Sequence, residues 1–144
     1  GAELTMALTL DRKLKHVGTT LADLSSQQRY IRAEELDDML SIAGRFLQPY
    51  DAAPFGITIS GIEIDADGNG TVAWTRARHG VENERSFQFD FDELDAPRSS
   101  FVVAAEAQYA YRPQGGYGLQ NPIKLQTVIY FQPRTGGRVE CTNC

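Results

Sequence analysis

The stretch FGITISGIEI-DADGNG-TVAWTR, residues 55–76, decides the fold. Apolar and polar residues alternate in both of its arms, as they do in β-strands with one buried face. The first arm carries its apolar side chains at Ile57, Ile59, Ile62 and Ile64. Gly61, between the two isoleucine pairs, predicts a β-bulge that resets the alternation. In the second arm the spacing predicts that Val72 and Trp74 share one face, so the stretch is expected to form an antiparallel hairpin.

The turn of this hairpin resembles the first half of a calcium-binding loop. Asp65, Asp67, Asn69 and Gly70 follow the D-x-D-x-N-G pattern. Position 12 of such a loop requires a bidentate Glu, but here it is Arg76, which would repel a cation. Asp, Asn and Gly also tolerate left-handed turn geometry. We therefore interpret the segment as a plain turn and expect no metal site, with weak cation binding left open.

Further strands follow the hairpin. The sequence predicts a third strand from about Phe101 to Tyr111 and a fourth from about Ile123 to Phe131. The intervening loop is rich in Gly and Pro, which is typical of a flexible connection. Residues 86–91 alternate Phe with polar residues and are expected to form another short strand. The pattern predicts an antiparallel meander.

Helical spacing dominates the residues before the hairpin. The first helix is indicated by a stripe at Leu10, Leu14, Val17, Leu21 and Leu24. The second is indicated by Leu36, Met39, Leu40, Ala43, Phe46 and Leu47, with Pro49 as its stop. Acidic residues are concentrated in the first turns of the second helix. We interpret them as charges that stabilise the helix dipole, rather than as metal ligands. The prediction is one α+β domain over residues 1–144, with an N-terminal amphipathic helix and a second helix packed on an antiparallel β-sheet of about four strands.

Composition limits the class of protein. The chain has 144 residues, of which 42% are hydrophobic and 23% charged, as in a soluble globular domain. The formal net charge is −5, with a basic excess in residues 1–32 and an acidic excess in residues 33–144. A nucleic-acid binder would carry a basic patch on its folded part. We therefore expect no nucleic-acid partner.

The N-terminal residues suggest that a natural segment is missing upstream. Gly1 and Ala2 read as residues that a protease leaves when an expression tag is removed. We expect the first helix to be the lower half of a longer one, with Leu21 and Leu24 packed inside the domain. The residues hypothesised to contact partner subunits are Leu4, Met6, Leu8, Leu10 and Leu14. Of these, the first three are expected to be exposed in the isolated domain.

The two cysteines, Cys141 and Cys144, form a C-x-x-C at the end of the chain. No helix can follow to lower a thiol pKa, and the only histidines, His16 and His79, show no zinc-ligand spacing. A disulfide formed in an oxidising compartment is favoured over free thiols or half a metal site. Because the loop is short, its role is expected to be local, tying down a frayed tail.

No enzyme motif is present. The nucleophile-elbow, P-loop, zinc-protease and Cys/His/Asn patterns are missing from the sequence. The Gly-rich residues 114–118 lie between predicted strands rather than before a helix, so they lack the amides that would bind phosphate. His79 is flanked by Arg78 and Gly80, as in an exposed loop. We expect no catalytic residue and no cofactor.

Several segments together resemble the TadE/TadG-like family of bacterial tight-adherence (Flp pilus) assembly proteins. They are the stretches TLADL (20–24), AEELDDML (33–40), PYD (49–51), FVVAAE (101–106), YAYRP (109–113) and FQPRTGGRVEC (131–141). The sequence departs from the family's pattern at Gln132, where Arg is common. The resemblance implies a pilin-like domain in the periplasm, held by an N-terminal helix in the inner membrane; some members are cleaved like prepilins and act as minor pseudopilins.

Two functions therefore compete. The first is a non-catalytic structural or assembly subunit of a tight-adherence Flp/type IV pilus machine, whose partners are other pilus subunits and the membrane. The second is a soluble periplasmic binding or adhesion module that uses the sheet and the Gly-rich loop. A natural upstream segment of about 20 apolar residues would favour the first function. A cleavable signal peptide would favour the second.

Overall fold

The computed structural model describes residues 2–48, 50, 55–78, 99–111, 123–134 and 137–144. Its helices are α1 (Ala2–Ser26), α2 (Ala33–Ala43) and the short 3₁₀ helix η1 (Gly44–Leu47). Its strands are β1 (Tyr30–Ile31), β2 (Phe55–Ile64), β3 (Gly70–Arg78), β4 (Ser100–Tyr111), β5 (Ile123–Phe131) and β6 (Glu140–Cys141). The predicted α+β class is confirmed. Pro49, the Gly-rich residues 114–118 and the strand predicted at 86–91 lie outside the described residues.

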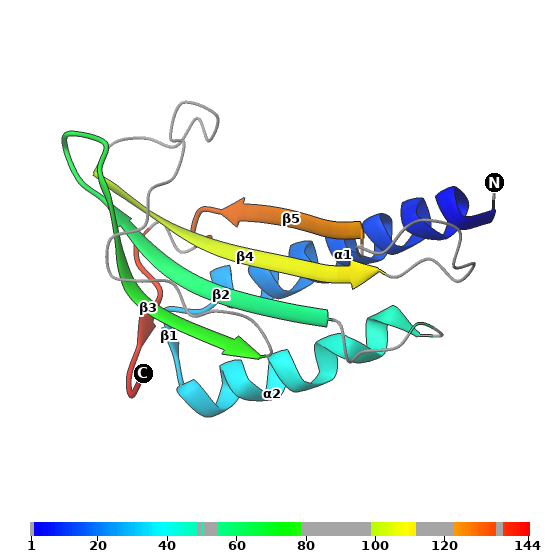
Figure 1. Ribbon diagram of the computed structural model, residues 1–144. Coiled ribbons are helices and arrows are strands. Elements are labelled where there is room, and N and C mark those ends of the chain that lie inside the picture. Colours follow the sequence, from blue (N-terminus) through cyan, green and yellow to red (C-terminus); the bar gives the residue numbers. More distant parts are fainter. Residues whose placement is uncertain (1, 49, 51–54, 79–98, 112–122, 135–136) are drawn as a thin grey trace.

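Four strands form one antiparallel sheet in the order β3-β2-β4-β5. The predicted meander is wrong, because β4 pairs with β2 and not with β3, the described strand before it in the chain. Figure 1 shows both helices on the same side of this sheet, α1 along β4 and β5 and α2 along β3. The main core lies between the layers and joins Leu14 and Leu36 from the helices to Ile59 and Val103 from the sheet. The predicted two-layer packing is therefore the observed one.

The prediction that Gly61 is the bulged residue and resets the alternation of its own strand is wrong, because the extra residue lies in the partner strand. β2 alternates without interruption against β4, whereas against β3 the register shifts between Gly61 and Ile62, so that Ala73 is the extra residue. The isoleucines of β2 consequently face both ways: Ile59 belongs to the core under the helices and Ile62 to a smaller cluster on the other face.

The prediction that Val72 and Trp74 share a face is wrong, because the extra residue between them reverses the alternation. Trp74 packs in the core under the helices, and Val72 packs in the cluster on the other face. An ideal Cβ at Gly61 would lie 2.4 Å from two atoms of the Trp74 indole. Glycine at this position therefore makes room for the indole.

The buried face of α1 is rotated away from the predicted leucine stripe. Leu10, Leu14, Val17 and Leu21 are buried as predicted, but Leu24 is 41% exposed. The buried arc includes three small residues, Gly18, Ala22 and Ser25, and the Ser25 hydroxyl contacts the sulfur of Met39 in α2 at 3.8 Å. A Cβ at Gly18 would lie 3.3 Å from the Ile129 side chain of β5. Close packing against β5 therefore turns Leu24 to the edge of the helix.

The C-terminal tail returns to the start of α2. β6 pairs in parallel with β1, Tyr30 opposite Glu140 and Ile31 opposite Cys141. The backbone N–H of Thr142 donates to the Ile31 carbonyl at 3.0 Å and extends this pairing. Within the described ranges, none of the helices has both the length and the apolar character of a membrane-spanning segment.

Candidate functional site

The residues predicted to contact partners divide into two groups. Met6 is 39% exposed and Leu8 is 53% exposed, as expected. Leu10 and Leu14 are fully buried in the core, so their assignment to a partner surface is corrected: they hold α1 on the sheet. The side chain of Leu4 lies outside the described residues.

Met6 and Leu8 project from different sides of α1. They are two residues apart, which corresponds to about 200° around an α-helix. The sheet packs on only one side of the helix, so it cannot cover both side chains. Figure 1 shows these first turns at the end of α1 that runs past the start of β5. The N-terminal turns of the helix thus carry apolar side chains that the domain itself leaves exposed.

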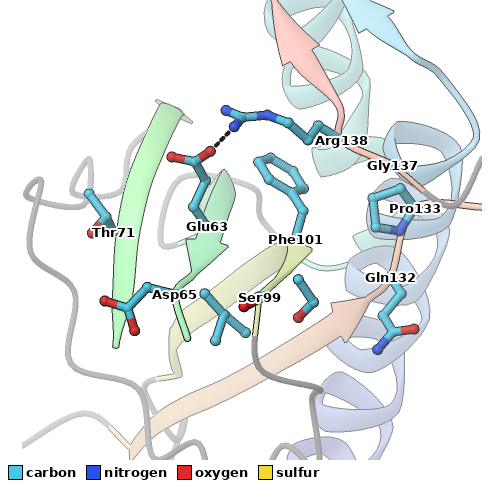
Figure 2. A pocket seen from close by; sticks show the side chains of 11 residues that line it. Glu63, Asp65, Thr71, Ser99, Phe101, Gln132, Pro133, Gly137 and Arg138 are labelled. Atoms are coloured by element: carbon cyan, nitrogen blue, oxygen red, sulfur yellow. Dashed lines mark hydrogen bonds and ion pairs between the residues drawn. The ribbon is translucent and has the colours of Figure 1, made fainter. Parts of the chain in front are cut away.

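A pocket of about 580 Å³ opens at the opposite end of the sheet. It is lined by residues from the ends of β2, β4 and β5 and from the C-terminal tail, among them Glu63, Phe101, Gln132 and Arg138. Its volume lies in the range of small-molecule sites. Figure 2 shows Arg138 reaching across the ring of Phe101 toward the carboxylate of Glu63.

The charged groups of the pocket already have partners. Arg138 forms an ion pair with Glu63 and places its guanidinium carbon 5.6 Å from the Phe101 ring centroid. Oδ1 of Asp65 accepts the backbone N–H groups of Asp67 at 2.9 Å and Asn69 at 2.8 Å. These contacts hold Arg138 over the Phe101 ring and fix the hairpin turn at the edge of the pocket.

One residue of the pocket has an unusual backbone. Ser99 has a φ of 57°, the left-handed region that non-glycine residues seldom occupy. Its N–H donates to the Asp65 carbonyl at 3.0 Å, which ties the start of β4 to the hairpin turn. Such backbone strain accumulates where the surrounding structure fixes the conformation, often at binding sites. The pocket rim is therefore anchored to the β2–β3 turn.

The predicted hairpin turn is observed at residues 65–69, where the Asp65 carboxylate binds the turn's own amides. Arg76 points away from it to α2: its Nε and Nη2 atoms donate to Asp37 at 3.0 and 2.6 Å. This hydrogen bond, and to a lesser degree the charge of Arg76, lowers the pKa of Asp37. In the described parts of the chain, no three His, Cys, Asp or Glu residues are close enough to hold a metal ion.

The structure describes one of the two histidines, His16, whose ring contacts an aromatic neighbour. The His16 ring lies 6.0 Å from the Phe46 ring in an edge-on arrangement. Phe46 follows α2 in η1, so the aromatic pair joins the two helices. His79 lies outside the described residues.

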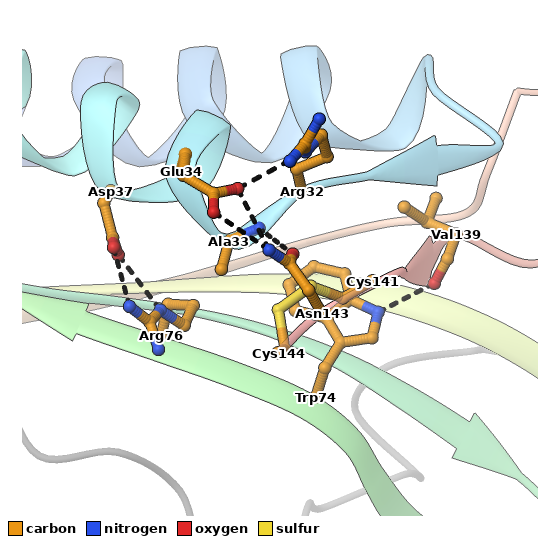
Figure 3. The surroundings of a disulfide bond; sticks show 10 residues. All are labelled: Arg32, Ala33, Glu34, Asp37, Trp74, Arg76, Val139, Cys141, Asn143 and Cys144. Atoms are coloured by element: carbon orange, nitrogen blue, oxygen red, sulfur yellow. Dashed lines mark hydrogen bonds and ion pairs between the residues drawn. A yellow bond between two sulfur atoms is a disulfide. The ribbon is translucent and has the colours of Figure 1, made fainter.

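The disulfide region joins three parts of the chain (Figure 3). Cys141 and Cys144 are joined, with their Cα atoms 5.5 Å apart. Between them, Asn143 accepts the backbone N–H of Ala33 with its Oδ1 atom at 2.8 Å. Its Nδ2 atom donates to the Glu34 carboxylate at 2.9 and 3.1 Å. Asn143 therefore binds the first turn of α2 from the far end of the chain.

Asn143 performs a task that α2 cannot perform for itself. The residue at the N-cap position is Arg32, which makes no side-chain cap hydrogen bond, because a guanidinium has no acceptor atom. Asn is among the best capping residues. The hydrogen bond from Asn143 to the Glu34 carboxylate is also the largest cause of the lowered pKa of Glu34.

Trp74 fixes the part of the tail just before the disulfide. Its indole N–H donates to the Val139 carbonyl at 2.7 Å, and both residues are buried. Sequence reasoning found the two cysteines but missed this bond and the Asn143 cap. Asn143 and Ala33 are 110 positions apart, so no local pattern connects them. Comparison of the chain with family models, curated proteins and solved structures finds no match.

Proposed function

We propose that this chain is a non-catalytic structural or assembly subunit, similar to a minor pseudopilin, of a bacterial tight-adherence Flp/type IV pilus machine. The proposal includes a periplasmic location for the domain, an inner-membrane anchor and other pilus subunits as partners. It rests on the family resemblance of the sequence and on one structural observation, the division of α1 into a buried part and an exposed part.

The division of α1 is what a shared helix requires. From Leu10 to Ser26 the helix packs on β4 and β5 and belongs to the domain's core. Before Leu10, Ala7 still packs against the core, but the exposed side chains of Met6 and Leu8 leave apolar surface on two sides of the helix. Apolar surface removed from water contributes about 25 cal/mol per Å², so a neighbouring subunit or lipid that covers these turns gains binding energy.

Substitutions at Met6 and Leu8 test the proposal. Gln keeps a good helix propensity while it removes the apolar contact, so Met6→Gln with Leu8→Gln should leave the melting temperature of the isolated domain unchanged within about 2 °C, as expected of exposed positions. In the full-length protein the same pair should impair piliation and surface adherence. Thr19→Gln, at an exposed position farther along α1, is the matched control and should affect neither.

Photo-crosslinking identifies the partner directly. A photoreactive amino acid at position 8 in the full-length protein should give an adduct with another pilus subunit, and the same group at position 19 should not. The proposal is wrong if the Gln pair melts the isolated domain and leaves adherence intact, because the N-terminal turns would then be ordinary core.

The second candidate function is a binding module, which the pocket beside Phe101 favours. Thr71, Ser99 and Gln132 supply hydroxyl and amide groups at its walls, the polar groups that orient small ligands. NMR titration with free amino acids and monosaccharides as probes would test it. Saturable shifts confined to the pocket, and lost in Gln132→Ala, would favour this function over the first.

A further inference from the structure

We propose that the Cys141–Cys144 disulfide is a redox-controlled clamp that holds Asn143 as the N-terminal cap of α2. In the oxidised protein Asn143 binds the Ala33 amide and the Glu34 carboxylate. Reduction opens the four-residue ring and releases the cap, while the tail before it stays docked. This inference does not depend on the proposed function, because it concerns only contacts within the domain.

The position of Asn143 explains why the cap needs the disulfide. The last backbone hydrogen bond of the tail is the one from Thr142 to Ile31. Beyond it, the disulfide joins Cys144 back to Cys141 and closes a ring that contains Thr142 and Asn143. Ordering a residue opposes binding through lost conformational entropy. The disulfide ring restricts the backbone of Asn143 before it binds. Its weak hydrogen bonds to α2 are therefore enough to hold it in place.

The site is accessible to a reductant. Cys144 is exposed and Cys141 is half-buried, so a small thiolate can reach the bond. A dithiol such as dithiothreitol attacks one sulfur to form a mixed disulfide, and its second thiolate then displaces the remaining protein thiolate. Two electrons and two protons pass to the protein, which ends with two thiols, while the dithiol ends as a cyclic disulfide.

The tail upstream of the ring has its own anchors. Trp74 donates to the Val139 carbonyl, and the Glu140 N–H donates to the Arg29 carbonyl at 2.9 Å. Neither bond involves the ring between the cysteines. Opening the ring is therefore expected to uncap α2 without undocking β6.

The hydrogen-exchange rate of the Ala33 amide reports whether Asn143 still binds it. The emission of Trp74, the chain's single tryptophan, reports whether the tail stays packed over the indole. Reduction of the wild-type protein with dithiothreitol should raise the Ala33 exchange rate about tenfold, in line with the loss of an N-cap. Oxidised Asn143→Ala should show the same rise, and its reduction should add nothing. Thr142→Ala changes a neighbouring side chain of the same ring and should behave as the wild type.

Three results would overturn the proposal. The first is an unchanged Ala33 exchange rate on reduction of the wild type, or in Asn143→Ala. The second is an equal further rise on reduction of Asn143→Ala, which would show that the disulfide acts elsewhere. The third is a shift of Trp74 emission to that of the unfolded chain on reduction, because the disulfide would then hold the whole tail. Cys141→Ser with Cys144→Ser should reproduce the reduced wild type without reductant.

Discussion

Gly61→Ala should destabilise the domain strongly, although it adds a single methyl group. The new Cβ would lie 2.4 Å from the Cε2 and Nε1 atoms of Trp74 and 2.7 Å from Cζ of Phe101. Carbon atoms in contact are normally about 3.5–4.0 Å apart, so the indole would have to move by roughly 1 Å. Both aromatic side chains are buried, and the indole is also held by its hydrogen bond to the Val139 carbonyl.

The size of the effect follows from two losses. Overpacking of a filled core costs about 1–3 kcal/mol. A displaced indole also loses its hydrogen bond to the Val139 carbonyl, and an unsatisfied buried acceptor costs about 1–3 kcal/mol. Together they predict a loss of about 2–6 kcal/mol in the free energy of unfolding, a large part of the stability of an ordinary domain.

Urea unfolding followed by circular dichroism measures this loss. Gly137→Ala is the matched control, because nothing lies within 4 Å of a Cβ at that position, and it should change the free energy by less than about 0.5 kcal/mol. In a Trp74→Leu background the cost of Gly61→Ala should fall, since the main clashing atoms are gone. Wild-type stability of Gly61→Ala, or the same cost in both backgrounds, would refute the reasoning.

Three further predictions concern the first helix, the hairpin turn and the ion pair to α2. Leu21→Ala should cost about 2–5 kcal/mol, and the exposed Leu24→Ala less than about 1 kcal/mol; equal losses in urea unfolding would contradict the observed rotation of the helix. Calorimetric titration should detect no sub-millimolar calcium binding, and binding that is lost in Asp67→Ala would disprove this. The lowered pKa of Asp37 means that its pair with Arg76 stabilises the fold above the unfolded-state pKa near 3.8 and is lost as the pH falls through the lower folded value. Asp37→Asn should therefore lose less stability on acidification than the wild type, by under about 1 kcal/mol because the pair is half exposed.

The four strands of the larger sheet could be predicted because each has a local signal, whereas the two-residue strands β1 and β6 were not predicted. Alternating apolar residues and Gly-rich turns predicted four strands whose observed bounds differ by two residues or less, as with β4, expected from Phe101 and observed from Ser100. The helices were likewise indicated by their spacing. Periodicity is a property of short segments, so it determines which elements form.

Contacts between segments could not be predicted in this way. Gly61 predicted a bulge in its own strand, but the extra residue lies in β3 at Ala73, and no local pattern marks that position. Leu24 belonged to a good helical stripe, yet the close approach of Gly18 to Ile129 turns it outward. The pocket is formed by side chains from several strand ends, and it too has no local signal.

The bulge, the glycine and the C-terminal tail depend on one another. The extra residue at Ala73 turns Trp74 toward the helices, and Gly61 leaves room for its indole. The indole N–H then holds Val139, so that the following residues pair with β1 and deliver Asn143 to the start of α2. A substitution in β2 can therefore weaken the cap of α2. The losses in the free energy of unfolding caused by Gly61→Ala and by Asn143→Ala should consequently be non-additive. Displacement of Trp74 already removes part of the support on which the cap depends.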